Sequence, residues 1–250
     1  MIQSFVLTAA YVGVLYIRKE TRPSSTVGRD DRNVVIERLV LVSVVTALAC
    51  IWYWWHGYHL GLELSVENGV WAAKALGLTM ILFAGPLFEA LIVSPPSSYE
   101  LKEEILSLFG VRNFVIGPVT EELVFRACLL ASLEDSNWSF YKKVFLSPLF
   151  FGIAHLHHAY EQVLAQGTSQ LAKIVVVALF QLTFTSIFGW YAAFLCLRTG
   201  TVYAPIIAHI FCNFMGVPSG SLGHGSRIDL IYRGLLVVGL CAFSYLITQF

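Results

Sequence analysis

Charge is scarce in this chain of 250 residues. Charged residues make up 13% of it, where a soluble domain of similar length carries about 25%. The 16 basic and 16 acidic residues also balance. With no net charge, the composition gives no electrostatic reason to expect nucleic acid or an acidic protein as a partner.

Several catalytic and metal-binding motifs are missing as well. The five cysteines include no CxxC pair of the kind that holds zinc or performs redox chemistry, and they lie in apolar stretches typical of small buried side chains. There is no HExxH, although a zinc site assembled from separate helices remains open. There is no GxSxG, so a serine nucleophile has no support.

Hydrophobic sequence is abundant instead, at 57% of the residues with a mean hydropathy of +0.70. A helix needs about 20 residues to cross a bilayer. The chain is therefore predicted to be all-α: a polytopic transmembrane bundle of about eight spans forming one domain over residues 1–250. The predicted spans are 5–17, 39–55, 70–93, 113–133, 144–158, 171–197, 202–217 and 230–247. The first, fifth and seventh are short or interrupted, and seven spans are the alternative.

The segment 18–38 predicts the orientation of the bundle. It holds six basic residues together with loop-forming Pro23 and Gly28, and basic loops stay on the cytosolic side. Alternation then places 94–112, 159–170 and 218–229 on the cytosolic side too. Within 94–112, the stretch 101–108 could form an interfacial helix, although a solvated face is the simpler interpretation.

Ionisable side chains inside spans are costly and usually face the bundle interior. Glu121, Glu122 and Arg126 fall in the fourth predicted span. Glu122 and Arg126 are four residues apart, which favours an ion pair on one helix face. Glu121 lies about 140° around the helix from Arg126, so it is predicted to remain available. Gly117 and Pro118 suggest a helix start or kink, which would place both glutamates near a positive helix terminus.

The fifth and seventh spans carry imidazoles. His155 is predicted to face the bundle interior, with Phe151 one turn earlier as a wall of its pocket and Gly152 permitting close helix approach. His157 and His158 are interpreted as interfacial, with His157 pointing away from the other two.

In the seventh span, His209 and Asn213 share one helix face, four residues apart. With the predicted orientation, all these groups lie at a similar depth toward the cytosol. A glutamate and an imidazole there can activate water, and His209 and Asn213 can act as neutral donors to an oxyanion. This describes amide hydrolysis without a covalent intermediate. A thiol nucleophile at Cys212 has no sign of activation.

Three motifs, EELVFR from Glu121 to Arg126, FGIAH from Phe151 to His155 and HIFCN from His209 to Asn213, resemble the EExxxR, FxxxH and HxxxN motifs of type II CAAX prenyl endopeptidases. The ordered set lies within 113–217 and is specific, whereas EExxxR alone would be weak. The surrounding residues resemble the eukaryotic branch of that family.

The resemblance implies an endopeptidase that removes the aaX tripeptide from farnesylated or geranylgeranylated CAAX proteins, such as Ras-type small GTPases, in the endoplasmic reticulum membrane with its site facing the cytosol. It assigns water activation to Glu121 and His155 and the oxyanion hole to His209 and Asn213. Glu122, Arg126 and Phe151 support the site. The expected mechanism needs no metal or other cofactor.

Two other classes of protein compete with this interpretation. A proton- or ion-coupled transporter could use the same buried groups, but it would predict an inverted repeat, and the sequence shows none. A non-catalytic relative could keep the fold, but the complete set of Glu121, His155, His209 and Asn213 argues against it.

Overall fold

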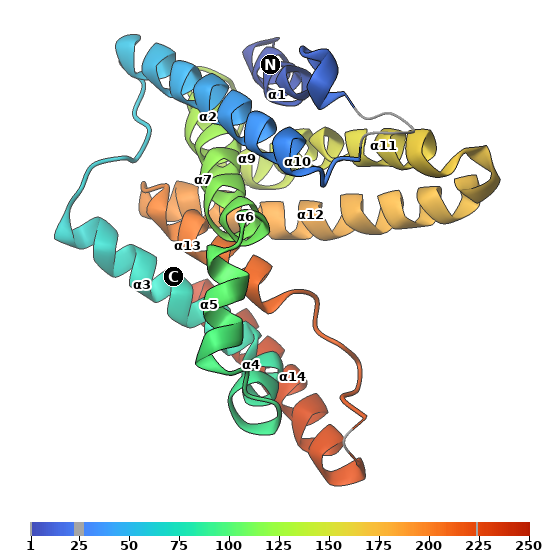
Figure 1. Ribbon diagram of the computed structural model, residues 1–250. Coiled ribbons are helices and arrows are strands. Elements are labelled where there is room, and N and C mark those ends of the chain that lie inside the picture. The colour runs from blue at the N-terminus through green and yellow to red at the C-terminus, as the bar shows by residue number, and fades with distance from the viewer. Residues whose placement is uncertain (1, 23–27, 224) are drawn as a thin grey trace.

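The computed structural model of the protein describes residues 2–22, 28–223 and 225–250 (Figure 1). All the regular elements of these residues are helices, and they include no strand. The prediction of an all-α protein is confirmed for this part of the chain.

Three helices are long and apolar enough to cross a membrane: Arg32–Trp55, Thr168–Thr199 and Arg227–Gln249. A fourth span is possible if the bent pair Val66–Leu82 and Ala84–Val93 counts as one. Ile2–Tyr16 and Tyr203–Met215 are apolar but shorter. A membrane protein is supported, whereas the count of eight spans stays a prediction.

The N-terminal helices form one side of the molecule. Helix α1 (Ile2–Gly13), extended by the 3-10 turn η1 (Val14–Tyr16), lies against α2 (Arg32–Trp55) and α10 (Pro148–Ala154) (Figure 1). Asp31 begins α2 by accepting a hydrogen bond from the Asn33 backbone N–H, the usual role of an aspartate at an N-cap.

The predicted third span, 70–93, is not one straight helix. α3 (Val66–Leu82) is followed by α4 (Ala84–Phe88) and the π-helical η3 (Glu89–Val93) after a bend of 83°. Pro86 lacks the N–H that would continue the helix across the bend. α14 (Ser226–Leu246) packs on both α3 and α4, and Gly85 allows this because a Cβ there would lie 2.8 Å from a Leu236 methyl group.

The central helix is a continuous run from Leu108 to Ala131, and it alternates between α and π geometry. It consists of α6 (Leu108–Gly110), η4 (Val111–Ile116), α7 (Gly117–Glu122), η5 (Leu123–Cys128) and α8 (Leu129–Ala131), of which η4 and η5 are π-helical. α7 does resume at Gly117, as the Gly–Pro pair suggested. Helical turns precede it, however, so the expectation that the glutamates lie near a positive helix terminus is wrong.

The segment before the central helix is α5 (Ser98–Leu106), which is opened by a capping box between Ser97 and Glu100. No side chain of α5 is buried. A helix is thus confirmed close to the predicted 101–108, with its charges on solvated faces.

The predicted fifth span, 144–158, is also broken. α9 (Phe140–Leu146) and α10 are separated at Ser147, and the chain turns at His155 into α11 (His157–Gln166). The next helix, α12 (Leu171–Thr199), then runs back alongside α11 and α10 (Figure 1). Gly152 lets α10 approach α12, since a Cβ on it would lie 2.8 Å from the Ser186 hydroxyl. The remaining elements are α13 (Tyr203–Met215) and the 3-10 turns η2 (Lys19–Thr21), η6 (Thr168–Gln170) and η7 (Ile247–Gln249).

Candidate active site

Glu122 is completely buried and is held from two sides. Its Oε1 accepts a hydrogen bond of 3.1 Å from Arg126 Nη1, one turn later in the central helix, and one of 2.7 Å from His209 Nδ1 on α13. The predicted Glu122–Arg126 pair is therefore present. The hydrogen bond from His209 also joins Glu122 in the central helix to α13, which sequence spacing could not show.

Arg126 is buried among aromatic rings. Its guanidinium carbon lies 4.4 Å from the centre of the Phe151 ring and 5.7 Å from that of Phe188. Arginine interacts favourably with aromatic faces, so the packing compensates part of the desolvation of its charge. Phe151 thus supports the site through Arg126 as well as through His155.

Glu121 faces a different environment from its neighbour. It lines a cavity of about 210 Å³, and its side chain is 24% exposed. Oε2 lies 3.7 Å from His209 Nε2, and no hydrogen bond to this carboxylate is found within the described residues. The prediction that one glutamate is held while the other remains available agrees with this geometry.

His155 lies at the C-terminal end of α10 and lines the same cavity as Glu121. Its Nδ1 is 2.8 Å from the Phe151 carbonyl oxygen, and its ring packs edge-on against the Phe151 ring at 4.6 Å. A carbonyl can only accept, so Nδ1 carries a proton and donates. In the neutral ring Nε2 is then an acceptor, the form that a base or a proton relay needs.

Asn213 also lines the cavity, and its side chain is tied to the central helix. Its Nδ2 donates a 2.9 Å hydrogen bond to the carbonyl of Asn113. In the π-helical turn the Gly117 N–H donates to the Arg112 carbonyl, and the next residue, Pro118, has no N–H to offer Asn113. Asn213 therefore satisfies a carbonyl that the proline leaves without a helical donor, and its second amide proton has no partner among the described residues.

His209 lies between the two glutamates. With Nδ1 donating to Glu122, a neutral ring has no proton on Nε2, the nitrogen that faces Glu121. Donation from both nitrogens requires the doubly protonated ring, for which the two carboxylates supply counter-charges. The sequence interpretation of His209 as a neutral donor does not anticipate this arrangement.

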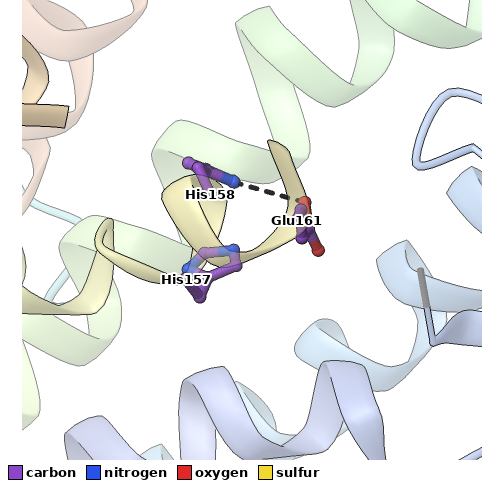
Figure 2. A group of neighbouring side chains, drawn as sticks. All are labelled: His157, His158 and Glu161. Atoms are coloured by element: carbon purple, nitrogen blue, oxygen red, sulfur yellow. Dashed lines mark ion pairs between the residues drawn. The ribbon is translucent and has the colours of Figure 1, made fainter. Parts of the chain in front are cut away.

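His157 and His158 are closer to the site than the sequence interpretation placed them. Both line the cavity with His155, and the expectation that His157 points away is wrong, because its ring lies 3.9 Å from that of His158. The physical reason is the turn at His155, which ends the helix on which the three positions were compared. Figure 2 shows His157, His158 and Glu161 gathered at the start of α11.

These three residues could in principle hold a metal ion, since their ligand atoms lie within 4.8 Å of one another. Their surroundings favour an ion-pair network instead. Glu161 Oε1 accepts from Arg38 at 2.8 Å and from Tyr16 at 3.1 Å, while Arg29 Nη1 lies 3.0 Å from His158 Nδ1. Two guanidinium groups already provide the positive charge that a metal would bring.

The titration behaviour of this network agrees with that assignment. Burial by itself raises the pKa of Glu161. The interactions with His158 and Arg38 outweigh that effect and lower the pKa to about 2. Because the folded-state pKa is depressed, the contribution to stability is present above the ordinary glutamate pKa and is lost only as pH falls toward 2. The network that joins α11 to the N-terminal segment thus persists at neutral pH.

Sequence reasoning missed the other polar residues of the cavity wall. The cavity is also lined by Tyr11, Arg29, Arg38, Arg112, Asn113 and Thr120. The basic residues at 29 and 38 were used only to predict orientation. A usable signal was the position of Arg112 on the predicted edge of the fourth span, nine residues before Glu121.

Comparison with known proteins gives concordant matches. Residues 103–215 match the family described as "Type II CAAX prenyl endopeptidase Rce1-like". The chain is 34% identical to the probable CAAX prenyl protease 2 of Schizosaccharomyces pombe, covering 96% of this chain and 89% of the relative. It is 37% identical to the human CAAX prenyl protease 2, covering 94% of this chain and 76% of the relative.

A shorter match, 48% identical, joins 43% of the chain to 34% of the CAAX prenyl protease 2 of Arabidopsis thaliana. No solved structure matches. The three motifs lie together in one fold around a single cavity, and the similarity to the fission yeast and human proteins extends over nearly the whole chain. The protein belongs to the family of type II CAAX prenyl endopeptidases.

Proposed function

We propose that this chain is a membrane endopeptidase that removes the aaX tripeptide from prenylated CAAX proteins, using water activated by Glu121 and His155. The observation that carries the mechanism is that the two adjacent glutamates lie in different surroundings. Glu122 is buried with its Oε1 held by Arg126 and His209, whereas Glu121 faces a cavity that it shares with His155.

In this mechanism Glu121 removes a proton from the attacking water, while His155 Nε2 accepts a hydrogen bond from the same water and orients it. The hydroxide adds to the carbonyl of the prenylated cysteine. The oxyanion accepts hydrogen bonds from Nε2 of the doubly protonated His209 ring and from the second amide proton of Asn213. Collapse breaks the C–N bond, and the proton held by Glu121 goes to the departing amine of the tripeptide.

The position of the cavity supports a site open to the cytosol. Its wall includes Arg29 and Arg38 from the basic segment 18–38, which the positive-inside rule assigns to the cytosol.

We propose the endoplasmic reticulum membrane as the location of the protein and Ras-type small GTPases among its substrates. The proposal treats residues 1–250 as one domain, with eight spans and a motif core at 113–217. A prenyl chain contributes about 0.8 kcal/mol per CH₂ buried in lipid, so such substrates reach this depth readily.

The decisive experiment reconstitutes the protein in vesicles and offers a farnesylated CAAX peptide on the outside. Release of the free tripeptide, measured by mass spectrometry, is the expected result. A transporter that uses the same buried groups would leave the peptide intact and would move protons or ions across the vesicle membrane. Intact peptide with purified, folded protein would contradict the proposal.

Activity is expected to survive metal chelators, because the proposed roles are filled by side chains. Turnover should change less than about twofold after dialysis against EDTA or phenanthroline. Loss of a catalytic metal would have a far larger effect, because it removes several kcal/mol of transition-state stabilisation. The measurement is tripeptide release before and after dialysis. A loss that zinc alone reverses would favour the zinc-dependent mechanism.

A further inference from the structure

The mouth of the cavity is lined by three arginines. Arg29 comes from the segment that leads into α2, Arg38 comes from α2 itself, and Arg112 comes from the π-helical η4 near the start of the central helix. Arg38 is committed to Glu161 and to the Thr21 carbonyl. In Arg29 and Arg112, the Nη2 group makes no hydrogen bond to the described residues and can bind a further group.

An exposed carboxylate already lies between these two arginines. Asp30 Oδ1 accepts from Arg112 Nη1 at 2.7 Å and lies 3.9 Å from Arg29 Nε. Asp30 is 60% exposed, so it can move aside at little cost. Among the described residues, these three arginines pair with two carboxylates, Asp30 and Glu161.

The π-helical turn explains why Arg112 reaches the cavity. Nine residues separate it from Glu121, which on a regular α-helix would place the two about 180° apart. The wider turn at Val111–Ile116 takes up about one extra residue and reduces that separation to about 80°. Both side chains therefore line the same cavity.

The spacing along the helix matches the leaving group. Eight or nine rises of 1.5 Å place Arg112 roughly 13 Å from Glu121 along the axis. An extended tripeptide spans about 10–11 Å, and its free α-carboxylate would then arrive close to the arginine side chains. Guanidinium groups bind carboxylates with charge-assisted, often bidentate hydrogen bonds.

We propose that Arg112 and Arg29 form a subsite for the C-terminal carboxylate of the substrate, occupied by Asp30 when no substrate is bound. The proposal rests on the proposed function, because it assumes that a tripeptide leaves from this cavity. It makes these arginines determinants of where the peptide is cut: an enzyme that holds the free C-terminus roughly 13 Å from Glu121 cuts three residues from the end. A peptide without a terminal charge is not held at that distance from Glu121.

The test compares a farnesylated CAAX peptide bearing a free acid with the same peptide bearing a C-terminal amide. The wild-type protein is expected to prefer the acid by about tenfold in kcat/KM, the range of one charge-assisted hydrogen bond partly screened by solvent. Arg112→Gln and Arg29→Gln should each reduce this preference to about twofold by raising KM for the acid. Arg32→Gln, in the same segment but absent from the cavity wall, is the matched control and should keep the full preference.

For Asp30→Asn we expect a change in KM of opposite sign. Removing the competing carboxylate should lower KM for the acid several-fold, an effect that misfolding cannot produce. If Asp30→Asn and both arginine variants retain the wild-type preference while Glu121→Ala is inactive on both peptides, the subsite is wrong and the proposed function stands. If the wild-type protein releases tripeptide from neither peptide, the proposed function itself fails.

Discussion

Replacing Glu121 by alanine is expected to reduce tripeptide release by a factor of about 10³ or more, since a positioned general base contributes about 10²–10⁴ in rate. Glu121 is the glutamate that faces the cavity, while the adjacent Glu122 is completely buried with its Oε1 held by Arg126 and His209. Glu122 cannot take over its role. His155→Ala should produce a loss of similar size, because its Nε2 shares the same water. The measurement is single-turnover release from a farnesylated peptide in vesicles.

Two controls make this result specific. Glu121→Gln keeps the shape and the hydrogen-bonding capacity but cannot take a proton, so it should be as inactive as the alanine variant while unfolding at the wild-type temperature. Cys212→Ala should remain active, because that thiol has no role in the mechanism. Active Glu121 and His155 variants together with an inactive Cys212 variant would establish a thiol nucleophile instead.

The second large effect is expected at Arg126. Arg126→Met should lower the free energy of unfolding by about 3–5 kcal/mol, because it leaves the charge of Glu122 buried without its guanidinium partner. Methionine fills most of the space between Phe151 and Phe188, so the loss reflects charge more than cavity formation. Thermal or denaturant unfolding in detergent micelles measures it.

The double variant Glu122→Gln, Arg126→Met separates charge from packing. It removes both charges together, and it should recover at least half of the lost stability even though catalysis remains impaired. Replacing a whole buried ion pair by neutral groups is often close to neutral. A double variant no more stable than Arg126→Met would show that packing, and not the unpaired charge, explains the loss.

The sequence by itself determined the helical class and the motifs on which the catalytic set is proposed. Scarce charge and long apolar runs exclude a soluble domain, and helix spacing alone separates Glu121 from the Glu122–Arg126 pair, because side chains four apart share a face. His209 and Asn213 fall on one face for the same reason. The family resemblance rested on these same residues, and the comparisons confirmed it.

Only the tertiary structure decided how these residues meet. The α-helical period holds only while the helix continues. Breaks at Phe83, Ser147 and His155 divided two predicted spans. The turn at His155 brought His157 and His158 to the cavity wall. The π-helical turn before Gly117 rotated Arg112 toward Glu121. The hydrogen bond from His209 to Glu122 joins residues 87 positions apart, a contact that no local pattern encodes, since it depends on how separate helices pack.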